Sequence, residues 1–111
     1  MKIYKPGHPV DSSTSGKPIM VLLELLGNRW ALRILWELRE ESLKFEPLKK
    51  NCGEISPTSL NKRLSELREA KIVEHKSKQG YMLTDTGCDL LQALKPLNGF
   101  AEQWVKKFKE Q

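Results

Sequence analysis

The side chains best placed to do chemistry lie between positions 55 and 72, in a stretch typical of one amphipathic helix. Leu60, Leu64 and Leu67 recur at helical spacing and mark the side that a core would bury. Small hydrogen-bonding side chains and a lysine occupy the opposite side and its flanks, and such groups suit contact with base edges in a DNA major groove. An ordinary surface helix is the alternative on this stretch alone. The candidate base-reading residues are Thr58, Ser59, Asn61, Lys62 and Ser65.

The start of this helix is marked by local signals. Ser56 can accept a hydrogen bond from a free backbone amide, which makes it a good cap. Pro57 suits the first helical position, because the N–H that proline lacks has no partner there. Ile55 and Leu60 hold the two positions of a hydrophobic staple. These signals predict that the helix begins at Pro57.

Two helices precede this stretch. Residues 18–26 form a short apolar helix, which Gly27 is expected to end in the left-handed conformation. Asn28 can then cap a second helix over residues 30–40. The second helix is apolar on most sides and is therefore predicted to be the central helix of the core. Its residues expected to pack inside are Trp30, Ala31, Ile34, Leu35, Trp36 and Leu38.

The region around the polar helix has the order of a winged helix-turn-helix. A brief strand at 42–44 leads to a short helix at 45–50 and a turn at 51–54. A short helix, a turn and a second capped helix make a helix-turn-helix. A predicted hairpin follows, with strands at 72–76 and 81–83, and a hairpin in this position is a wing.

Lysines gather at the end of the short helix and in the hairpin. Such residues are expected to contact phosphates, which fix the register of a protein on the duplex. Arg63 lies nearer the leucine side of its helix than Lys62, so an ion pair within the protein is the alternative for Arg63. The candidate phosphate-contacting residues are Lys49, Lys50, Arg63, Lys76 and Lys78.

Two further helices follow the hairpin. Thr84 is expected to cap the first, which runs to Leu94, and Pro96 must kink or restart the chain. Apolar residues then step by four and three positions, the spacing of a helix–helix seam. One small domain cannot cover this seam, so we expect a homodimer; folding back on the chain's own core is the alternative. The candidate dimer-interface residues are Leu22, Leu90, Leu94, Leu97, Ala101, Trp104 and Phe108.

Length and charge limit the domain organisation and the partners. A chain of 111 residues favours one domain, and a net charge of +5 suits a polyanionic partner such as DNA. Residues 1–16 are predicted to be an extended or flexible arm, mildly basic through Lys2, Lys5 and His8. Residues 17–111 form the predicted DNA-binding domain, whose dimerisation helices begin at about residue 85.

The same composition argues against a membrane protein, an enzyme and a metal site. No apolar run reaches membrane length, and the first residues lack the apolar core of a signal peptide. His8 and His75 stand alone, and no catalytic constellation is present, so we expect no enzyme activity, no metal and no cofactor. Cys52 and Cys88 are far apart, which suits a reducing cytoplasm. Oxidation of Cys52 would disturb the neighbouring helix, but an inert thiol is the alternative.

A series of short motifs runs in a fixed order along residues 17–108. They are Leu25-Leu26-Gly27-Asn28-Arg29-Trp30, Ile34-Leu35-Trp36-Glu37-Leu38, Phe45, Leu48, Ile55-Ser56, Leu60, Arg63-Leu64, Glu66-Leu67, Leu83-Thr84-Asp85-Thr86-Gly87, Pro96 and Trp104. In order and spacing these motifs resemble the HxlR-type winged-helix transcription regulators of the MarR-like superfamily. The resemblance implies an α+β, mostly α fold. It would be a winged helix-turn-helix with a short β-hairpin wing and with N- and C-terminal dimerisation helices.

The resemblance also implies a function. The chain would be a sequence-specific regulator that binds double-stranded DNA as a homodimer on an inverted-repeat operator. A small-molecule effector of unknown identity would bind between the two protomers, near Trp30, Trp36 or Trp104. Lys17 stands where many members carry a cysteine, so redox sensing at that position is excluded. The wing, at residues 74–81, is shorter than is common in the family.

An interaction module that docks on another protein is the alternative function. Glu66 on a flank of the polar helix and Glu69 on its outer side favour this alternative, as does the short wing. If the helix binds DNA, these carboxylates would repel phosphates. Only its first two turns are then expected to enter the groove.

Overall fold

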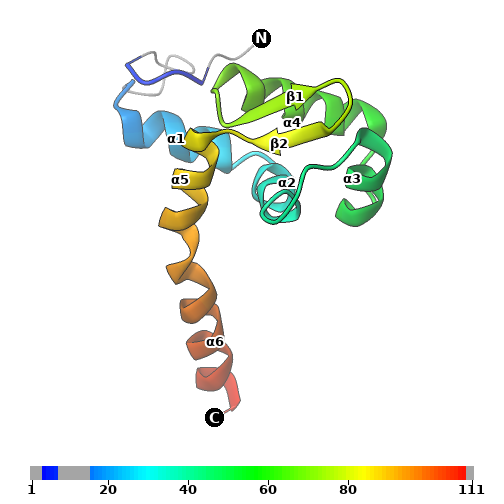
Figure 1. Ribbon diagram of the computed structural model, residues 1–111. Helices are drawn as coiled ribbons and strands as arrows, with labels where there is room; N and C mark the ends of the chain where they lie inside the picture. The colour runs from blue at the N-terminus through cyan, green and yellow to red at the C-terminus, as the bar shows by residue number, and fades with distance from the viewer. Residues whose placement is uncertain (1–3, 8–15, 110–111) are drawn as a thin grey trace.

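The computed structural model describes residues 4–7 and 16–109, which form six helices and a two-stranded antiparallel hairpin. In chain order the elements are α1 (Pro18–Leu26), α2 (Ala31–Glu37), α3 (Phe45–Cys52), α4 (Pro57–Glu69), β1 (Val73–Lys76), β2 (Gly80–Leu83), α5 (Asp85–Leu94) and α6 (Pro96–Lys109). Figure 1 shows α1 to α4 and the hairpin in one body, from which α5 and α6 extend as an arm. The predicted winged helix-turn-helix fold is confirmed.

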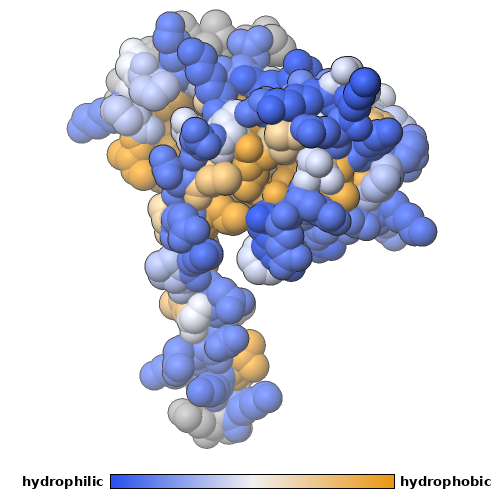
Figure 2. All heavy atoms as spheres, viewed as in Figure 1, coloured by the Kyte–Doolittle hydropathy of each residue, from blue (hydrophilic) through white to orange (hydrophobic). Residues whose placement is uncertain are grey.

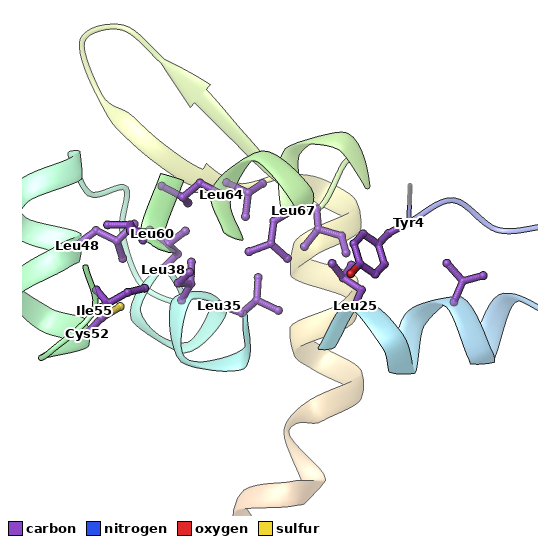
Figure 3. Close-up of a cluster of buried hydrophobic side chains, with 14 residues drawn as sticks. Tyr4, Leu25, Leu35, Leu38, Leu48, Cys52, Ile55, Leu60, Leu64 and Leu67 are labelled. Atoms are coloured by element: carbon purple, nitrogen blue, oxygen red, sulfur yellow. The ribbon is translucent and has the colours of Figure 1, made fainter. Parts of the chain in front are cut away.

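The core is organised around the leucine side of α4. Leu60, Leu64 and Leu67 are each exposed by 2% or less, as their spacing predicted. They pack in one cluster with Leu35 from α2 and Leu48 from α3 (Figure 3). Full burial of one such side chain contributes roughly 1.5–3 kcal/mol. The cluster therefore fixes which side of α4 faces the core and which side faces solvent.

The start of α4 is confirmed in detail. The Ser56 hydroxyl accepts a hydrogen bond from the backbone N–H of Ser59 at 3.1 Å, and Pro57 is the first helical residue. Ile55, one half of the predicted staple, is buried beside Leu60 in the same cluster.

The start of α2 differs from the prediction. Trp30 precedes the helix in the left-handed conformation, with φ of 78°, and no side chain caps the helix. The predicted cap, Asn28, instead donates its Nδ2–H to the Tyr4 hydroxyl at 2.7 Å. Gly27 is not left-handed, since its φ is −74°. The helix also ends at Glu37, three residues early. The Asn28 prediction is wrong because the helix begins only at Ala31, which leaves Trp30 in the capping position.

Tyr4 ties the N-terminal segment to the body. Its side chain is 3% exposed and belongs to the core cluster, where Figure 3 shows it beside Leu25. No periodic pattern in the predicted arm marks this residue as buried. Lys5 is exposed, whereas Lys2 and His8 lie outside the described residues.

The turn before α4 is shorter than predicted, because α3 continues to Cys52. Arg33 of α2 donates from Nη2 to the carbonyl oxygen of Asn51 at 2.8 Å and so fastens the end of α3. The predicted strand at 42–44 shrinks to one bridge, in which Leu43 pairs with Tyr81.

The wing is a short hairpin with a fixed register. Val73 pairs with Leu83, and Lys76 pairs with Gly80. Strand β1 therefore begins one residue later than predicted, and strand β2 begins one residue earlier. Gly80 has φ of 93°, and a Cβ there would lie 2.5 Å from the carbonyl oxygen of Leu43. Only glycine fits this close approach.

Helices α5 and α6 follow the prediction. The Thr84 hydroxyl accepts a hydrogen bond from the Gly87 N–H at 3.0 Å, which caps α5. The chain breaks after Leu94 and restarts at Pro96. No residue of α6 is buried.

One core prediction is wrong. Trp36 is 47% exposed on the outer side of α2, whereas Trp30 is half-buried against the core. The apolar residues of α2 cover more of its circumference than the body packs against. The apolar composition of α2 therefore predicted more burial of its side chains than the structure shows.

Candidate nucleic-acid interface

The outer face of α4 presents most of the predicted base-reading residues to solvent. Ser59 is half-buried, and its hydroxyl accepts a hydrogen bond from the Ser56 hydroxyl at 3.0 Å, so it serves the helix cap. An amide, an ammonium and two hydroxyls remain free to meet donor and acceptor groups on base edges. The exposed candidates are Thr58, Asn61, Lys62 and Ser65.

Arg63 and Glu66 form an ion pair between Nη1 and Oε1 on a flank of α4. The Glu66 side chain is 3% exposed and the Arg63 side chain 17%. Among the described residues Glu66 is the one buried charged side chain, and an unpaired carboxylate in that place would be costly. The pair favours the structural role for Arg63 over the phosphate contact. Glu66 lies on a flank of α4, as expected, but its burial there was not predicted.

The remaining candidate phosphate contacts flank the reading face. Lys49 and Lys50 lie in the last turn of α3, the first half-buried and the second exposed. Lys76 ends β1, and Lys78 lies in the exposed loop between the strands. Figure 1 shows α3 and the tip of the hairpin at the same end of the molecule as the start of α4. The Lys76 ammonium lies 3.9 Å from Glu74, a surface contact that contributes little energy.

Two residues beside this face were missed in the sequence. Arg68 is exposed and follows Asn61 and Ser65 by seven and three positions, so the helical period could have revealed it. His75 is exposed on β1, with its ring centroid 4.5 Å from that of Tyr81. The face of the hairpin on which His75 lies depends on how the two strands pair, and no local sequence pattern fixes that pairing.

The candidate dimer residues divide into two groups. Leu22, Leu90 and Leu94 are half-buried, and Leu90 packs against the chain's own core. The four on α6 are exposed, Phe108 by 65%. Figure 2 shows apolar side chains where α5 meets the body and on one side of α6. Further exposed apolar residues on α1 and α6 are Ile19, Met20, Leu23, Phe100 and Val105.

The two cysteines have different surroundings. Cys52 is buried at the end of α3, and burial raises the pKa of its thiol. The carboxylate of Glu37 adds to this rise in the pKa, and the guanidinium of Arg33 opposes it. Cys88 is exposed in α5. Because the thiolate is the reactive form, the structure favours the inert alternative for Cys52.

Neither a metal site nor a membrane span is found in the described part of the chain. No group of three or more His, Cys, Asp and Glu side chains there could hold a metal ion. No helix there is both long enough and apolar enough to cross a bilayer.

Residues 25–109 match the family described as HxlR-like helix-turn-helix, so the chain belongs to the HxlR family of transcriptional regulators. An uncharacterized HTH-type transcriptional regulator of Halalkalibacterium halodurans is 32% identical over 87 residues, which cover 72% of this chain and 77% of the relative. The resemblance seen in the sequence motifs is thereby confirmed, apart from most of α1, which precedes the matched range.

Solved structures agree with this assignment. Quinone-bound YodB of B. subtilis is 29% identical with a TM-score of 0.72, covering 77% of this chain and 96% of YodB. A possible HxlR family transcriptional factor of Thermoplasma volcanium is 25% identical with a TM-score of 0.67, covering 92% of this chain and 88% of that one. The chain is therefore a transcriptional regulator of the HxlR type, a class that acts through DNA.

The two thiols should react at very different rates. In the folded protein at mildly alkaline pH, iodoacetamide should alkylate Cys88 at least about tenfold faster than Cys52, which is buried and less ionised. Because its pKa is raised, Cys52 should gain reactivity only at higher pH than an ordinary thiol. Mass spectrometry of digested protein measures both rates. A Cys88→Ser variant isolates Cys52, and labelling in guanidinium chloride supplies the unfolded control. Equal rates in the folded protein would contradict the burial of Cys52.

Proposed function

We propose that the chain is a sequence-specific regulator that binds double-stranded DNA as a homodimer on an inverted-repeat operator. The observation that carries this proposal is the exposed polar face of α4, held outward by three buried leucines and a capped start. Membership of a family of transcriptional regulators supports it. Regulation is then carried out through binding alone, without enzyme activity, in the cytoplasm where the DNA is.

The face of α4 suits direct readout near its start. The Asn61 amide can bond adenine in two places, and the Lys62 ammonium can bond guanine. Thr58 and Ser65 carry hydroxyls that accept or donate, so they adapt to several bases. The lysines of α3 and of the wing supply sequence-independent attraction to phosphates.

The protein-docking alternative loses part of its support. One of its two acidic residues, Glu66, is buried and paired with Arg63, so a partner protein cannot meet it. Glu69 remains exposed, at the end of α4 and one turn beyond Ser65, and is the acidic residue that still favours this alternative.

A homodimer accounts for the apolar side of α6. Leu97, Trp104 and Phe108 are each more than half exposed and recur at the spacing of a packed helix pair. Monomeric proteins rarely leave so large a contiguous apolar surface in water. Pairing about a two-fold axis would present two copies of α4, and dimeric helix-turn-helix proteins place these about 34 Å apart on half-sites of opposite orientation.

A cavity supports binding of a small-molecule effector. It has a volume of about 870 Å³ between α2 and the α5–α6 arm, within the usual size range of ligand sites. Trp36 lines it with Leu91 and Leu94, and the Arg39 guanidinium lies 4.0 Å from the centre of the Trp36 ring. Neither Trp30 nor Trp104 lines the cavity. The quinone in the YodB structure makes a quinone a reasonable first probe.

Substitutions on α4 should separate base reading from phosphate attraction. Sequences selected from a random DNA pool first define the operator. Asn61→Ala and Lys62→Ala should each weaken operator binding by about 1–3 kcal/mol and relax the preference at one base pair. Lys50→Ala and Lys78→Ala should weaken operator and random DNA alike and reduce the salt slope by about 0.9 for each lost phosphate contact.

Fluorescence anisotropy with labelled duplexes over a salt series measures these effects. An Arg63→Met, Glu66→Leu double variant is the matched control on the same helix, because it removes the ion pair without leaving a buried carboxylate unpaired and should leave the slope unchanged. The proposal fails if the wild-type protein shows no salt-sensitive binding, or if Asn61→Ala and Lys62→Ala bind the operator as tightly as wild type.

Light scattering should give twice the mass of one chain at micromolar concentration. A Trp104→Glu, Phe108→Glu double variant should give the monomer mass, because two buried carboxylates would break the seam. Lys106→Glu, on the side of the same helix opposite the seam, is the control and should remain dimeric. A monomer mass for the wild-type protein would refute the homodimer.

Calorimetric titration tests the effector cavity. A water-soluble quinone should bind saturably to a Cys88→Ser protein, in which the exposed thiol cannot add covalently to the probe. Trp36→Ala should weaken this binding by roughly tenfold or more, since an aromatic wall of the cavity is removed. Trp104→Ala should leave it unchanged. Absence of a saturable heat, or an unchanged affinity in Trp36→Ala, would count against this site for quinones.

A further inference from the structure

A second hollow lies between the outer flank of α4 and strand β1. It is a groove with a volume of about 570 Å³. Ser65, Arg68 and Glu69 line it from α4, and Glu74 and His75 line it from β1. Because Ser65 is also a candidate base-reading residue, the groove opens directly beside the reading face of α4.

The groove has more free positive than free negative charge. Arg68 and Lys71 are exposed, and neither forms an ion pair with another described residue. The carboxylate of Glu74 lies 3.9 Å from the Lys76 ammonium, which offsets its charge. The remaining acid is Glu69, at the end of α4.

We infer that this groove holds the sugar–phosphate backbone of one DNA strand, with Arg68 and His75 contacting phosphates from its two walls. The inference rests on the proposed DNA-binding function. A helix with its side chains is about 10–12 Å wide, and the major groove is about 12 Å wide. When the polar face of α4 meets the base edges, its flanks therefore meet the strands that border the groove. The flank that carries Arg68 is also the one that β1 faces.

The chemistry of both walls suits a phosphodiester. A guanidinium can donate two parallel hydrogen bonds to phosphate oxygens. An imidazole N–H donates one, and contact of the His75 ring with Tyr81 holds that ring on the hairpin. Glu69 opposes the contact, because its carboxylate follows Arg68 directly. Contact with DNA thus extends into the last turn of α4, beyond the first two turns expected from the sequence.

Opposite effects of two neighbouring residues provide the test. Arg68→Ala should weaken binding to a fluorescein-labelled random-sequence duplex by about two- to tenfold and reduce the salt slope by about 0.9. Glu69→Gln should strengthen binding to the same duplex, because a repulsive charge is removed. Arg68→Lys should restore the slope, since it keeps the charge.

His75→Ala should weaken binding to the same duplex, because an N–H donor to phosphate is lost. Lys107→Ala, on α6 and far from the groove, should behave as wild type.

The outcomes separate this inference from the function on which it rests. If the wild-type chain shows no salt-sensitive affinity for DNA, both are overturned. If the wild-type chain binds but Arg68→Ala and Glu69→Gln bind equally well at every salt concentration, this inference alone is overturned. It is also overturned if Arg68→Ala changes which operator sequence is selected, because a phosphate contact carries no base preference.

Discussion

Burial of the leucine side of α4 is the constraint on which the rest of the molecule depends. Leu60, Leu64 and Leu67 enter a core that every neighbouring element also contributes to. Because successive helical residues are about 100° apart, this burial alone decides which side chains face outward. A rotation by one residue would expose the leucines and turn Asn61, Ser65 and Arg68 toward the core in their place. The reading face is therefore rigid because the opposite face is well packed, and the cap at Ser56 fixes where the helix begins.

An ion pair within α4 changes which charges the helix presents to solvent, and a count of its charged residues does not reveal this. Of the charged residues on α4, Arg63 and Glu66 neutralise each other on a flank turned toward the core. The charges left outside are Lys62 near the middle of the helix, and Arg68 and Glu69 at its end. Lys62 thus lies among the small hydrogen-bonding groups of the reading face, and the other two free charges follow them. A surface of this kind combines orientation on a charged backbone with contact to uncharged base edges.

The molecule also keeps its two proposed interfaces apart. The polar face of α4 and the hairpin lie on the body, whereas the exposed apolar side of α6 lies on the arm that extends from it (Figure 1). Thr84 joins them, since its hydroxyl caps α5 and also donates to the carbonyl oxygen of Lys71, just before β1. The direction of the arm is therefore tied to the wing and to the end of α4. In a dimer formed through the arms, the same joint would set the spacing between the two reading helices.

Local sequence determined what depends on neighbours within a turn or two of helix. The leucine stripe, the caps at Ser56 and Thr84, the restart at Pro96 and the order of motifs that places the chain in the HxlR family all belong here. Tertiary structure decided what depends on distant partners. Tyr4 became a core residue and accepts a hydrogen bond from Asn28, while α2 begins after a left-handed Trp30 and not after Asn28. Glu66 was buried, and the register of the hairpin brought His75 beside Arg68. Capping and periodicity are short-range effects, whereas burial of a polar group and the lining of a groove depend on which segments meet in space.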